Sequence, residues 1–178
     1  MILSQYIVNF QMDIVGWFRT YCQYRKIRCQ KGGYEMEDHT IALLQECSQG
    51  CKMGIKSINQ VSEYVSDQKL KRIMETYQGE HQRIEAEADK MLSMFGLSGK
   101  QPEMMATAMS WVSTEMKMMM KDDDKQAAKI MTEGCDMGIR TICGFINQYA
   151  GASKSSLGLA KDLVNMEEKF REEMKPYL

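Results

Sequence analysis

The residues with the clearest potential for chemistry are two cysteines, a histidine and a glutamate: Cys51, His81, Cys135 and Glu167. If a turn between two helices is centred near Ser66, Cys51 and His81 lie about 15 residues on either side of it, level and facing each other. Cys135 and Glu167 flank a second turn near Ala152 in the same way, with a mismatch of about two residues, or ~3 Å along the axis. The spacing therefore predicts that the four side chains meet in one central layer.

Two interpretations of this layer stay open. Two thiolates, an imidazole and a carboxylate, with Glu80 flanking, are suitable ligands for zinc or another divalent metal. Alternatively, the cysteines are small buried hydrophobic residues, and His81 forms a satisfied polar pair with Glu80 or Glu167. Glycines near both cysteines indicate close helix packing and favour this second interpretation.

A ferritin-type di-iron centre finds little support in the chain. Such a centre needs an inward glutamate on two helices and a Glu-x-x-His motif on the other two, and the motif is absent. With Cys51 and Cys135 taken as the centres of the buried faces, Glu46 and Glu133 are predicted to point away from the core. A di-iron oxidase or an iron-handling protein is therefore the least favoured function.

The elements that must position these residues are all helical. The chain has only two prolines and eighteen methionines, which favours helices over strands. Apolar residues recur every three or four positions, as in a helix with one buried face. The expected helices span about 37–64, 68–95, 123–149 and 154–177, with a shorter crossover helix over 103–120.

A repeat relates the two halves of the chain. The segment 50–58 matches 134–142 at a constant offset of 84 residues, and Lys56/Arg140 and Ser57/Thr141 are conservative differences. Two equal hairpins (37–96 and 123–178) joined by a long crossover (97–122) predict an all-α, ferritin-like four-helix bundle.

Several motifs resemble a family of small bacterial ferritin-like proteins of unassigned function. The resemblance covers about residues 40–177 and rests on the following residues: Leu44-Gln45-Glu46, Gly50, Glu80, Phe95-Gly96, Trp111, Asp122-Asp123 and Glu133-Gly134-Cys135-Asp136. It implies the fold and no settled activity.

The first 35 residues are predicted to be a separate segment. Residues 31–35, Lys-Gly-Gly-Tyr-Glu, can be encoded by a purine-rich ribosome-binding string directly before Met36, which suggests translation starting at Met36. Residues 1–35 carry a net charge of +3 and the remainder −4, in agreement with this hypothesis. The alternative is an additional amphipathic N-terminal helix over about 2–24 that packs on the bundle.

Composition narrows the function without identifying it. A net charge of −1 with no basic stripe argues against nucleic acid, and no apolar run is long enough to span a membrane. Polar residues interrupt any export signal, so a cytoplasmic location with free thiols is expected. The leading prediction is a non-catalytic bundle that acts as a homo-oligomer or through a protein partner, with no cofactor. The alternative is a metal-binding or thiol-based role of the central layer.

Overall fold

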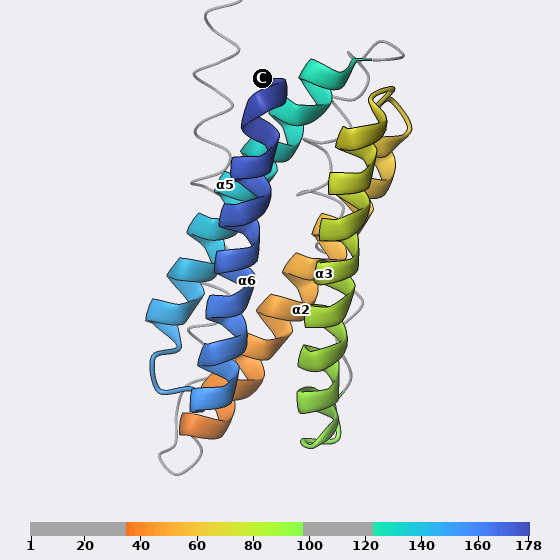
Figure 1. The fold of residues 1–178 in the computed structure, drawn as a ribbon. Coiled ribbons are helices and arrows are strands. Elements are labelled where there is room, and N and C mark those ends of the chain that lie inside the picture. The colour runs from red at the N-terminus through yellow and green to blue at the C-terminus, as the bar shows by residue number, and fades with distance from the viewer. Residues whose placement is uncertain (1–34, 98–122) are drawn as a thin grey trace, which may run out of the picture. The chain divides into compact units, whose positions relative to one another are not determined.

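Four long helices form the described part of the molecule. The computed structural model describes residues 35–97 and 123–178. The helices are α2 (Glu35–Ser62), α3 (Gln68–Ser93), α5 (Asp124–Gln148) and α6 (Lys154–Met174), and a short 3-10 helix η1 (Lys175–Tyr177) follows (Figure 1). The predicted all-α bundle of two hairpins is confirmed, because α2 packs on α3, α5 packs on α6, and the hairpins meet through α2–α5, α3–α6 and α2–α6. The predictions for residues 1–34 and for the crossover helix lie outside the described residues.

Contacts at the two ends fix the direction of each helix. At one end, the backbone N–H groups of Ser66 and Asp67, in the α2–α3 turn, donate to the carboxylate of Asp124 at the start of α5. At the other end, the N–H of Ser153, just before α6, donates to Thr40 Oγ1 near the start of α2 at 2.8 Å. Helices α2 and α5 are therefore antiparallel. Because α3 starts at the same end as α5, these two helices run parallel, and α3 ends roughly 39 Å from the start of α5 (Figure 1).

Local sequence explains where the helices begin and end. Asp67, Asp123 and Ser153 are N-caps whose side chains accept backbone N–H groups in the first turns of α3, α5 and α6. Gly96, at φ +67°, adopts the left-handed conformation that favours glycine, just after the end of α3.

The apolar faces of the four helices make one core. Ile41 and Ile55 are only half-buried, whereas Leu43, Cys47 and Val61 are fully buried. Glu46, which was predicted to point away from the core, is only 7 % exposed, so it is buried rather than on a solvent-facing side of α2. Glu133 is exposed, as predicted.

No helix in the two described ranges is long and apolar enough to cross a membrane.

Replacing Asp124 with alanine should destabilise the bundle by about 1–2 kcal/mol, because its carboxylate accepts three hydrogen bonds from the α2–α3 turn, two of them from backbone N–H groups. The change is measured as the free energy of unfolding in urea. Asp162→Ala, at an exposed position of α6, is the matched control and should have little effect. Equal losses in the two variants would show that the contact between the turn and α5 contributes nothing.

Candidate functional site

A histidine and a glutamate from different hairpins meet inside the bundle. His81 on α3 is 1 % exposed. Its Nε2 lies 3.0 Å from Oε1 of Glu167 on α6, whose side chain is 12 % exposed. Its Nδ1 lies 2.7 Å from the carbonyl oxygen of Tyr77, one turn earlier on α3. Both ring nitrogens therefore have partners, one within the helix and one across the α3–α6 interface.

These partners determine how the pair holds its protons. A carbonyl oxygen only accepts, so Nδ1 must carry a proton and donate it to Tyr77. The contact between Nε2 and the carboxylate then needs one further proton, on either Nε2 or Glu167. Burial lowers the pKa of His81, but the hydrogen bond to Glu167 and its negative charge outweigh burial, so the pKa of His81 is raised overall. The direction of this shift favours the proton on the His81 ring.

Two glycines leave the space for this pair. A Cβ atom on Gly54 of α2 would lie only 2.4 Å from His81 Nε2, and one on Gly138 of α5 would lie 3.3 Å from Glu167 Oε1. Gly54 and Gly138 are equivalent positions of the repeat, 84 residues apart. Each hairpin thus uses its first helix to make room for a polar side chain on its second helix.

The two cysteines of the predicted layer are buried and stay protonated. Burial, together with the charge of Glu167 and a hydrogen bond to it, raises the pKa of the Cys135 thiol. Burial also raises the pKa of Cys51, and the neighbouring Cys47 and Glu167 raise it further. Reactive cysteines are found in electropositive, partly exposed surroundings that lower the thiol pKa. These surroundings do the opposite, so both thiols are poor nucleophiles near neutral pH.

The sequence-predicted layer is partly assembled. His81, Glu167 and Cys135 come together, and Gly54 of α2 lies against the His81 ring. Cys51, about one turn before Gly54, is buried within reach of the charge of Glu167. Glu80 does not take part, because its carboxylate is half-exposed and forms an ion pair with Arg83 at 3.0 Å. Within residues 35–97 and 123–178, no three His, Cys, Asp or Glu side chains are grouped so as to hold a metal ion.

Sequence reasoning missed Tyr77 as a member of the site. Its carbonyl orients His81, its ring stacks on Phe170 of α6 with centroids 4.5 Å apart, and its hydroxyl donates to Glu173 at 2.7 Å. The position four residues before a buried histidine was the available signal, because a helix brings that carbonyl under the imidazole ring.

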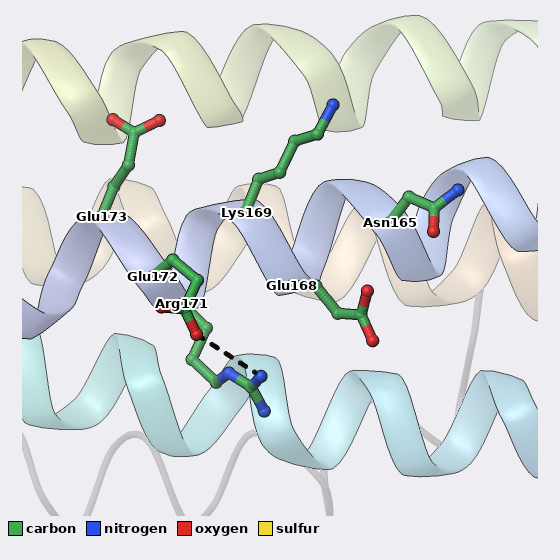
Figure 2. A pocket seen from close by; sticks show the side chains of 6 residues that line it. All are labelled: Asn165, Glu168, Lys169, Arg171, Glu172 and Glu173. Carbon is green, nitrogen blue, oxygen red and sulfur yellow. Dashed lines mark ion pairs between the residues drawn. The ribbon is translucent and has the colours of Figure 1, made fainter.

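The surface also has a shallow hollow along the outer face of α6. Its lining residues are Asn165, Glu168, Lys169, Arg171, Glu172 and Glu173 (Figure 2). Glu173 and Lys169 point toward α3, whereas Arg171 lies toward α5, where it pairs with Asp136 at 2.8 Å. The charges are of both signs and partly neutralise each other, so the hollow indicates no particular ligand.

Thiol accessibility gives a direct test of this arrangement. With iodoacetamide near neutral pH, we expect the native protein to be alkylated at the exposed Cys143 before the other three described cysteines. Cys47, whose pKa burial raises to about 12, should react only after unfolding, as should Cys51 and Cys135. Peptide mass spectrometry of native and urea-unfolded samples reads out each site. Labelling of Cys51 or Cys135 in the native protein as fast as Cys143 would contradict the buried layer.

Comparisons with known proteins find no match among family models, curated proteins or solved structures. The function must therefore be argued from the chain itself.

Proposed function

We propose that this chain is a non-catalytic, ferritin-like helical bundle that acts through self-association or a protein partner. The observation that carries the proposal is that the polar groups of its central layer already have partners within the protein. Both nitrogens of His81 are engaged, by Tyr77 and Glu167, and burial and the same carboxylate raise the pKa of the Cys135 thiol and keep it protonated. A buried polar group whose bonds are all made within the protein supports packing rather than turnover.

The helix directions support the ferritin-like part of the proposal. Because α3 and α5 run parallel, the second hairpin starts at the opposite end of the bundle from where the first one stops. Ferritin-like bundles are distinguished from simple up-down-up-down bundles by one long crossover connection of this kind.

A metal-binding bundle is the second candidate, because Glu167 contacts His81 and also raises the pKa of the Cys135 thiol. The three side chains are not grouped to hold a metal ion in the described residues, so binding would have to draw them together. Zinc bound there would have to displace the proton of the Cys135 thiol and the hydrogen bond between His81 and Glu167. Metal binding would then add stability by mass action, and a chelator would remove it.

One set of measurements on the untagged full chain separates the two candidates. Metal content is measured by mass spectrometry, the melting temperature with and without a chelator, and molar mass by sedimentation across a range of concentrations. We expect less than stoichiometric metal, an unchanged melting temperature, and a molar mass that rises with concentration. Stoichiometric zinc with a chelator-sensitive melting temperature would replace the proposal with the metal candidate. A monomer at every concentration would rule out self-association.

A further inference from the structure

The two hairpins place one polar core residue at equivalent positions, and the two residues are of opposite kinds. Gly54 makes room for His81 in the first hairpin, and Gly138 makes room for Glu167 in the second. His81 and Glu167, which face these glycines, are 86 residues apart, as are the N-caps Asp67 and Ser153 of their helices, so they hold equivalent positions in the two hairpins. They also meet each other, with Nε2 and Oε1 3.0 Å apart, across the α3–α6 interface.

The unlike pair can be buried without net charge. With Nδ1 donating to Tyr77, one proton bridges His81 and Glu167, and the pair is either an imidazolium with a carboxylate or a neutral imidazole with a carboxylic acid. Both states are neutral overall. Cys135 and Cys51 stay protonated, because burial raises the pKa of each, so they add no charge to the layer.

Two residues of the same kind at these positions cannot be buried without a net charge. Two facing carboxylates that share one proton keep a net charge of −1, and two imidazoles that share one bridging proton, each bonded to its own helix carbonyl, carry +1. An uncompensated charge in a core is costly, so such pairings are disfavoured.

We propose that His81 and Glu167 are the complementary element by which the first hairpin recognises the second, in preference to the corresponding hairpin of another copy of the chain. The repeat makes the first helices of the two hairpins alike around this pair, at Gly54 and Gly138, so that part of the packing discriminates poorly between the two kinds of pairing. A buried polar pair supplies the discrimination, as single buried polar residues do when they fix register and partner choice in coiled coils.

Exchanging the two residues tests the complementarity. The full-chain variants are His81→Glu, Glu167→His and the double variant with both changes, each measured with a chelator present so that bound metal does not contribute. Each single variant creates a like pair and should lower the melting temperature by on the order of 10 °C. The double variant restores an unlike pair on two glycine-lined positions and should recover at least half of that loss. A double variant no more stable than the weaker single variant, or one that does not fold, overturns the proposal.

A second variant tests the choice of partner. His81→Gln combined with Glu167→Gln gives amides that can pair equally well in like and unlike arrangements. After refolding, light scattering should find a larger fraction of higher-mass assemblies than in the wild type, because hairpins of different copies are no longer rejected. The same mass distribution in the two proteins contradicts the selection of partners, whatever the stability of the variant.

Discussion

Replacing Gly54 with alanine should destabilise the bundle by about 3 kcal/mol. The new Cβ would lie 2.4 Å from Nε2 and 2.5 Å from Cδ2 of His81. The ring cannot move aside freely, because Tyr77 and Glu167 hold its two nitrogens. Overpacking costs roughly 1–3 kcal/mol and a broken buried hydrogen bond about as much again, whereas the gain in helix propensity offsets only ~1 kcal/mol. Urea unfolding of the full chain measures the change.

Two other glycines of the repeat are controls for this effect. At Gly138 the new Cβ would lie 3.3 Å from the flexible end of Glu167, so alanine should change stability by less than about 1 kcal/mol. At Gly134 no atom of the described residues would lie within 4 Å of the new Cβ, and alanine should stabilise the helix by roughly 0.5–1 kcal/mol. If the three variants unfold alike, the His81 ring does not pack on α2 as described.

Replacing His81 with leucine should cost about 3 kcal/mol near neutral pH and should change how stability depends on pH. The substitution leaves the carboxylate of Glu167, 12 % exposed, without its cationic partner. In the wild type the pKa of His81 is raised in the folded state, since the hydrogen bond and charge of Glu167 outweigh the effect of burial. The unfolded state then loses this proton first as pH rises.

The sign of the pH effect follows from this order. The stabilisation by His81 is fully present below the unfolded pKa of about 6.5 and is lost as pH rises through the higher folded pKa. The unfolding free energy of the wild type should therefore fall over that window, while the His81→Leu variant lacks the fall. Unfolding curves collected at a series of pH values measure both. Parallel pH profiles for the two proteins would mean that His81 does not gain a proton-dependent partner on folding.

The repeated segment was the most informative part of the sequence about the fold. Helix periodicity predicted the helix ends to within a few residues because capping residues such as Asp67 and Ser153 act locally. The burial of Glu46 was not predicted, because the burial of a helical residue depends on every segment that packs against the helix. Helix α2 touches α3, α5 and α6, so the extent of its buried surface cannot be found from the position of one cysteine.

In the candidate site too, some features were predictable from the sequence and others depend on packing between helices. Counting residues from the turns indicated that His81, Cys135 and Glu167 share a level, because the rise per residue is fixed by the helix itself. The sequence by itself determined the residue types, the two hairpins and the equivalence of Gly54 with Gly138. Only the tertiary structure decided that His81 packs against Gly54, that Tyr77 and Glu167 engage its two nitrogens, and that Glu80 pairs with Arg83. These outcomes depend on the rotation of each helix about its axis and on side-chain rotamers, which are set by packing between segments far apart in the chain.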